Sequence, residues 1–146
     1  MITGYEQAIR RLTTKFVRIE NAITDEIIKT GQGIENDATS LASGIGFFDP
    51  SGNWVMLNGK VKGTSFEGGN GYRIWVDAGK MGAYIEFGTG EYAGYTVGGY
   101  NPEWQALAYS FYVNGKGKLP SRPYMYPAYA KNTTGLIDRL RRSIQR

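Results

Sequence analysis

The chain has 146 residues, which is enough for one domain, residues 1–146, with a modest hydrophobic core. Seventeen basic residues against 13 acidic ones give a formal net charge of +4. The absence of cysteine and histidine excludes disulfides, thiolate metal sites, histidine-dependent nucleophilic catalysis and ordinary zinc catalysis. No apolar run approaches the roughly 20 residues of a membrane span, and the N-terminus has no signal-peptide layout, so we expect no membrane association.

A long amphipathic helix is predicted over residues 1–30. Its apolar residues recur at spacings of three or four, at Ile2, Tyr5, Ile9, Leu12, Phe16, Ile19, Ile23 and Ile27. Gly31 and Gly33 are predicted to end this helix, and residues 34–43 to form a short second one. The narrow stripe favours a helix packed across a sheet, and the alternative is that part of the stripe meets a partner subunit.

Residues 44–87 are predicted to form a β-rich core. Turn sequences occur at residues 49–52 and 67–71, and Asn58-Gly59 is typical of a two-residue hairpin turn. Residues 72–78 alternate between apolar and polar side chains, which indicates a half-buried strand. We therefore expect an antiparallel sheet.

The stretch AYIEFGTG, residues 83–90, leads out of this core. Its first half fits either a strand face or one helical turn. Residues 88–118 are then rich in glycine and tyrosine, and we expect a long loop with an interface role. Its aromatic residues favour an assembly interface, with a carbohydrate platform or ordinary loop packing left open. The interface candidates are Tyr92, Tyr95, Tyr100 and Trp104.

A C-terminal helix is predicted over residues 123–146, with Pro127 in its first turn. The segment from Arg122 to Arg146 holds six basic residues and one acidic residue. Arg139, Arg142 and Arg146 are expected on one side of the helix. This face is either a solvated or salt-bridged interface, or a surface that contacts DNA phosphates without reading sequence.

Glu86 is the most informative single acid. Glu86, Glu91 and Glu103 lie near aromatic residues, as carboxylates do in sugar-cleaving sites, but no pair of them has a recognisable spacing. The other interpretation places Glu86 at the end of a core element, where it accepts backbone N–H bonds or pairs with an arginine. The Gly88-Thr89-Gly90 stretch lacks a phosphate-loop pattern and predicts a tight turn with positive φ at a glycine.

Two segments in this order resemble a family of small tailed-phage proteins, the minor tail-component or tail-completion proteins of the neck. That family has a strand followed by an aromatic-rich EFGT segment, then a loop, then a Pro-aromatic-x-x-Pro-Ala segment opening a C-terminal helix. The matching residues of the first segment are Tyr84, Glu86, Phe87, Gly88 and Thr89. Those of the second segment are Arg122, Pro123, Tyr124, Pro127 and Ala128.

The resemblance implies an α+β fold, with an antiparallel β-sheet flanked by the long N-terminal helix and the C-terminal helix. It implies a structural virion protein with no enzymatic activity, no cofactor and no metal. Its partners would be copies of itself in a ring, expected to be hexameric, together with head-closure and tail-tube proteins and channel DNA. Assembly would take place in the host bacterial cytoplasm. The alternatives are a tail-terminator ring that caps the tail tube and, in another class, a small carbohydrate-binding or carbohydrate-cleaving domain.

Overall fold

The computed structural model describes residues 3–89, 102–103, 105–106 and 119–146. The chain is an α+β protein, as predicted. Its elements in chain order are α1 (Thr3–Leu41), β1 (Gly46–Phe48), β2 (Trp54–Met56), the 3₁₀ turn η1 (Leu57–Lys60), β3 (Val61–Phe66), the 3₁₀ turn η2 (Glu67–Gly69), β4 (Gly71–Val76), α2 (Lys80–Phe87), α4 (Met125–Thr133) and α5 (Leu136–Gln145).

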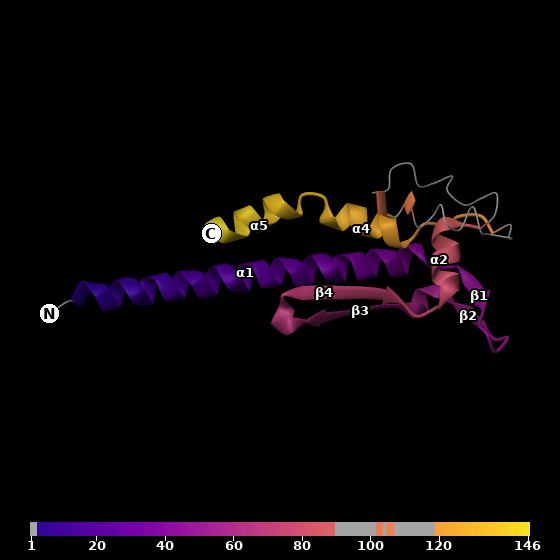
Figure 1. Ribbon diagram of the computed structural model, residues 1–146, viewed down its shortest axis with the longest axis horizontal. Coiled ribbons are helices and arrows are strands. Elements are labelled where there is room, and N and C mark those ends of the chain that lie inside the picture. Colours follow the sequence, from indigo (N-terminus) through magenta and orange to yellow (C-terminus); the bar gives the residue numbers. More distant parts are fainter. Residues whose placement is uncertain (1–2, 90–101, 104, 107–118) are drawn as a thin grey trace.

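Helix α1 is the axis of the molecule (Figure 1). The β3–β4 hairpin packs along one side of it, and α4 and α5 pack along another. The β1–β2 hairpin and α2 lie beyond the C-terminal end of α1, and the N-terminal part of α1 extends past every other element. The packed elements are therefore concentrated towards the C-terminal end of α1.

Helix α1 has 39 residues, so the prediction that it ends at Gly31 and Gly33 was wrong. Both glycines are close-approach positions inside the helix. A Cβ on Gly31 would lie 2.1 Å from Cγ of Tyr72, and a Cβ on Gly33 would lie 2.2 Å from Oδ1 of Asn132. These glycines admit side chains from β4 and α4. The short second helix expected at residues 34–43 does not form separately, because residues 34–41 continue α1.

The first hairpin follows its turn sequence. Strand β1 pairs antiparallel with β2, and Phe47 lies opposite Val55. Oδ1 of Asp49 accepts hydrogen bonds from the backbone N–H groups of Ser51 and Asn53, both at 2.9 Å, and Gly52 has a φ of 83°. Aspartate at the start of such a turn and glycine at its positive-φ position act through neighbouring backbone groups only. The sequence could therefore predict this turn.

The predicted hairpin turn at Asn58-Gly59 was wrong. These residues belong to η1, which links the two hairpins, and β2 does not pair with β3. Leu57, at the start of η1, is completely buried, and its N–H donates to the carbonyl of Ile45 at 2.8 Å. Burial of this leucine turns the chain into the core. As a result, the described residues form two separate two-stranded sheets in place of one antiparallel sheet.

The second hairpin joins β3 and β4 through the turn predicted at residues 67–71, with Lys62 opposite Trp75. The predicted alternation of β4 is confirmed, because Arg73 and Trp75 are exposed while Ile74 and Val76 are half-buried. Tyr72 lies on the face towards α1, and its hydroxyl donates to Oε2 of Glu35. That hydrogen bond, together with burial and the charge of Glu35, raises the pKa of Tyr72 to about 12.

Two further helix boundaries differ from expectation. Residues 80–87 form the helix α2, which resolves the ambiguity of residues 83–87 and places a helix inside the predicted β-rich segment. The predicted single C-terminal helix is two helices, because Gly135 adopts a left-handed conformation with a φ of 73° between α4 and α5. Pro127 still lies in the first turn of α4, where its missing N–H leaves no hydrogen bond unmade.

The hydrophobic core lies where α1, both hairpins, α2 and α4 meet. Its buried members are Ile34, Ala38, Ala42, Phe47, Leu57, Val61, Ile85, Tyr124 and Ala128. Ile34 and Ala38 of α1 and Ala42 just after it are spaced four residues apart, and the two alanines let the neighbouring elements approach closely. The core thus joins both halves of the sequence motif, through Ile85 and Tyr124.

Candidate functional site

Glu86 is an N-terminal cap supplied from a distant part of the chain. It is 2% exposed on α2, and its carboxylate lies at the start of α4. Oε2 accepts hydrogen bonds from the backbone N–H groups of Tyr124 and Met125, both at 2.8 Å, and Oε1 accepts one from Tyr126 at 3.0 Å. A carboxylate at this position satisfies N–H groups that have no partner within the helix and is favoured by the helix dipole.

Tyr124 provides a second link between α2 and α4, in which the side chain comes from the start of α4 and the backbone group from α2. Its ring is buried, and its hydroxyl donates to the carbonyl of Gly82 on α2 at 3.0 Å. A Cβ on Gly82 would lie 3.2 Å from this hydroxyl, so the glycine gives the tyrosine its close approach. Burial, and secondarily the charge of Glu86, raises the pKa of Tyr124 well above its ordinary value.

The segments that follow α2 and precede α4 are also joined to each other. The N–H of Thr89 donates to the carbonyl of Leu119 at 2.9 Å, and the N–H of Leu119 donates to Oγ1 of Thr89 at 3.0 Å. The hydroxyl of Ser121 donates to the carbonyl of Glu86, and the N–H of Arg122 donates to the carbonyl of Ile85. We call this set of contacts, together with those of Glu86 and Tyr124, the α2–α4 clamp.

Gly88 forms the turn by which the chain leaves α2 towards Thr89. It has a φ of 75° and follows the last residue of α2, and its N–H donates to the carbonyl of Tyr84. Positive φ is readily adopted by glycine and strained for other residues, so the tight turn predicted at residues 88–90 is confirmed at its first position.

The remaining motif residues line the clamp or its edge. Phe87 is buried and Tyr84 is half-buried on α2. Pro123 and Pro127 are half-buried on either side of the start of α4, while the side chain of Arg122 is exposed. The structure thus brings the two motif segments together, and Arg122 takes part through its backbone.

The chemistry of the clamp is that of a structural joint. Both carboxylate oxygens of Glu86 are engaged by helix N–H groups, so this acid is held in an acceptor role, and the backbone-accepting interpretation is confirmed. Glu103 lies exposed, and Glu91 falls outside the described residues. Among the described residues, no group of three acidic side chains is placed to hold a metal ion.

The next prediction concerned an aromatic interface. Tyr92, Tyr95, Tyr100 and Trp104 lie outside the described residues.

The three C-terminal arginines have different surroundings. Arg139 is held within the molecule, because Nε lies 3.3 Å from Oε2 of Glu26 and the two Nη atoms donate to the carbonyls of Asn132 and Thr134. Arg142 and Arg146 are exposed. The expected three-arginine face is therefore reduced to two outward-facing residues, because Arg139 fixes the α4–α5 junction against α1.

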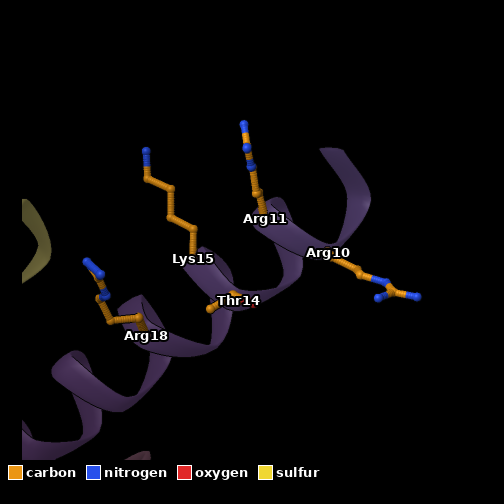
Figure 2. A pocket seen from close by; sticks show the side chains of 5 residues that line it. All are labelled: Arg10, Arg11, Thr14, Lys15 and Arg18. Carbon is orange, nitrogen blue, oxygen red and sulfur yellow. The ribbon is translucent and has the colours of Figure 1, made fainter. Parts of the chain in front are cut away.

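Sequence analysis missed a basic surface on the other terminal helix. We call residues 3–18 of α1 the arm. Its basic side chains are Arg10, Arg11, Lys15 and Arg18, and all four are exposed. Figure 2 shows Arg11, Lys15 and Arg18 pointing to the same side of the helix while Arg10 points elsewhere. The spacing of Arg11, Lys15 and Arg18, four and then three residues, was the signal available in the sequence.

Large apolar side chains are exposed at both ends of the molecule. On the arm, the apolar residues of the stripe are exposed, including Leu12 at 68% and Phe16 at 72%. At the opposite end, the outer face of the β1–β2 hairpin exposes Phe48, Trp54 and Met56. The Phe48 and Trp54 rings pack edge to face with their centroids 5.0 Å apart.

No protein-family model, curated protein or solved structure matches this chain. In the described residues, no helix combines the length and the apolar character that crossing a lipid bilayer requires.

Proposed function

We propose that this protein is a structural subunit of the neck of a tailed bacteriophage, a tail-completion protein that acts by assembly and not by catalysis. It would form a ring, expected to be hexameric, between the head-closure and tail-tube proteins. The ring would assemble in the host bacterial cytoplasm and remain in the virion.

One observation carries the proposal. Two sequence segments resemble the tail-completion family, and three backbone N–H groups of the second segment, 38 to 40 residues further along the chain, bind the Glu86 carboxylate of the first. A shared structural joint gives a physical reason for the two segments to occur together. An acid committed to this joint suits a protein whose role is to hold a shape.

The exposed apolar side chains also support a protein that acts by assembly. Contiguous apolar side chains on a surface mark contact sites with other proteins. This chain exposes apolar side chains on the arm at one end and on the β1–β2 hairpin at the other. Any contact with DNA in the channel would use the exposed Arg142 and Arg146 together with the basic residues of the arm, because Arg139 is engaged internally.

The test is assembly with partners of the same phage. We expect the purified protein to form rings visible by electron microscopy and to have a native mass several times that of one chain. The rings should bind tail tubes and head-closure complexes. A protein that stays monomeric at high concentration and binds neither partner would contradict the proposal.

A tail-terminator ring is the alternative within the same class. A terminator should stop elongation when it is added to polymerising tail-tube protein, before any head component is present. A tail-completion ring should instead bind tubes that have already stopped growing and should make them competent to join heads. The order of addition in such a reconstitution separates the two roles.

A further inference from the structure

The arm carries an apolar seam that no described residue covers. We define the seam as Tyr5, Ile9, Leu12 and Phe16, which are between 44% and 72% exposed. Single exposed apolar side chains are common on protein surfaces, but a contiguous row on one helix indicates a contact site. Most of the stability of helices in proteins comes from packing of an amphipathic face, so an uncovered apolar face also calls for a partner.

The seam continues the face by which α1 packs in the rest of the molecule. The stripe runs on through Ile19 and Ile23, which are half-buried, to the buried Ile34. The change occurs where α5 ends, at the level where Nη1 of Arg18 donates to the backbone carbonyl of Arg146 at 3.1 Å. Beyond that point the same face extends without a partner from this chain's described elements (Figure 1).

The spacing of the seam is that of a coiled coil, in which two residues of every seven form the core. Its members are separated by four, three and four residues, which repeats every seven residues. Ile9 and Phe16 take one core position of the heptad, and Tyr5 and Leu12 take the other. The same two heptad positions are apolar in successive repeats, which is the pattern of a helix that packs on another helix, so the seam favours a helix as its partner.

Charge complementarity identifies that partner as a second copy in a defined orientation. In this heptad, Lys15 and Glu20 occupy the two positions that flank the core, and both side chains are exposed. In a parallel, in-register pair, the flanking position of Lys15 contacts the other flanking position, five residues further along the partner helix. Lys15 of each copy therefore lies beside Glu20 of the other copy. An antiparallel pair brings flanking positions of the same type together and loses both attractions.

We propose that the arms of neighbouring copies pack in parallel and in register through the seam, as a coiled coil. The basic residues Arg10, Arg11 and Arg18 lie away from the seam, so their charges stay in water in this arrangement. The contact is between copies of this chain and does not depend on the neck role. Cyclic symmetry, in which all subunits point the same way, is compatible with parallel arms.

Engineered cysteines test the register directly, because the natural chain contains none. A parallel, in-register pair brings the same residue of two copies into the Cα separation of roughly 4.4–6.8 Å that a disulfide needs. We expect Leu12→Cys and Phe16→Cys to cross-link to themselves under mild oxidation, at least about tenfold faster than Thr14→Cys on the outer side. No cross-link at either seam position, or equal cross-linking at all three, would overturn the inference.

Charge substitutions provide an independent test in solution. Leu12→Glu should raise the dissociation constant of the self-associated species by at least roughly tenfold, while Thr14→Glu, which adds the same charge on the outer side, should change it little. Lys15→Glu alone should weaken association by roughly two- to tenfold, and Lys15→Glu with Glu20→Lys should restore it. Failure of the double variant to restore association would exclude the parallel register. Sedimentation measures the association, and circular dichroism checks that each variant remains folded.

The outcomes separate this contact from the neck role. If the Leu12→Glu variant forms rings of unchanged stability, the coiled coil is wrong while the neck role stands. If the arms cross-link as expected but the protein binds neither tail tubes nor head-closure complexes, the neck role is wrong while the coiled coil stands. If Leu12→Cys cross-links only when Trp54→Cys is also present, the arm instead docks on the β1–β2 hairpin of its neighbour.

Discussion

The two ends of α1 share one apolar stripe but have opposite surroundings. Towards its C-terminal end, α1 packs closely against its own chain, around small residues such as Gly31 and Gly33 and the buried Ile34. On the arm, the stripe presents large residues such as Leu12 and Phe16, and these are exposed. These large residues have no packing partner among the described elements, so this chain packs one end of α1 and leaves the other exposed.

The largest expected effect is at the packed end, at Glu86. Glu86→Ala removes the acceptor of three backbone N–H groups and should lower the free energy of unfolding by roughly 3 kcal/mol. Glu103→Ala, at an exposed acid, is the matched control and should change it by no more than about 0.5 kcal/mol. Denaturant unfolding measures both. Equal effects at the two positions would mean that the α2–α4 clamp contributes little to stability.

Two glycines of the same helix should respond in opposite directions. At Gly31, alanine places a Cβ 2.1 Å from Cγ of Tyr72, so Gly31→Ala should destabilise the protein by roughly 2 kcal/mol even after the gain in helix propensity. At Gly4, an added Cβ would meet no atom within 4 Å apart from the adjoining backbone of its own helix, so Gly4→Ala should increase helicity and stabilise the arm by up to about 1 kcal/mol. Denaturant unfolding and far-ultraviolet circular dichroism measure the two effects. A stabilising Gly31→Ala would show that β4 does not pack closely on α1.

The smallest effect is the pH dependence contributed by Asp37. Hydrogen bonds from Asn132 and Lys131, and the charge of Lys131, hold the pKa of this carboxyl below its ordinary value of 3.8. Because the folded-state pKa is lowered, the stabilisation is present above pH 3.8 and is lost as the pH falls through the folded-state value. The contribution should be below about 1 kcal/mol, since the side chain is partly exposed.

Asp37→Asn isolates this contribution. Its stability should fall less steeply with acid than that of the natural protein, and Lys131→Ala should reduce the slope in the same direction. Unfolding by denaturant at a series of acidic pH values gives the slopes. Identical slopes for Asp37→Asn and the natural protein would mean that the contact between α1 and α4 carries no pH dependence.

Local chemistry was readable from the sequence, and tertiary context was not. Asp49 and Gly52 formed the predicted turn because their roles depend only on neighbouring residues. Gly31 was wrongly predicted to end the helix. Its missing Cβ makes room for Tyr72, which lies about 40 residues away in sequence. Asn58-Gly59 was misread because burial of the adjacent Leu57 outweighed the turn preference. The backbone-accepting role of Glu86 was among the interpretations, but its acceptance of bonds from Tyr124 to Tyr126 required the fold.

The paired hydrogen bonds between Thr89 and Leu119 have an evolutionary consequence. They close the chain at the edge of the clamp, so the ends of the intervening segment are fixed by residues outside it. The entropy of closing a chain segment rises only slowly with its length, so the cost of bringing Thr89 and Leu119 together depends little on how many residues separate them. Selection can therefore change the number of residues between these two positions at little cost to the α2–α4 clamp.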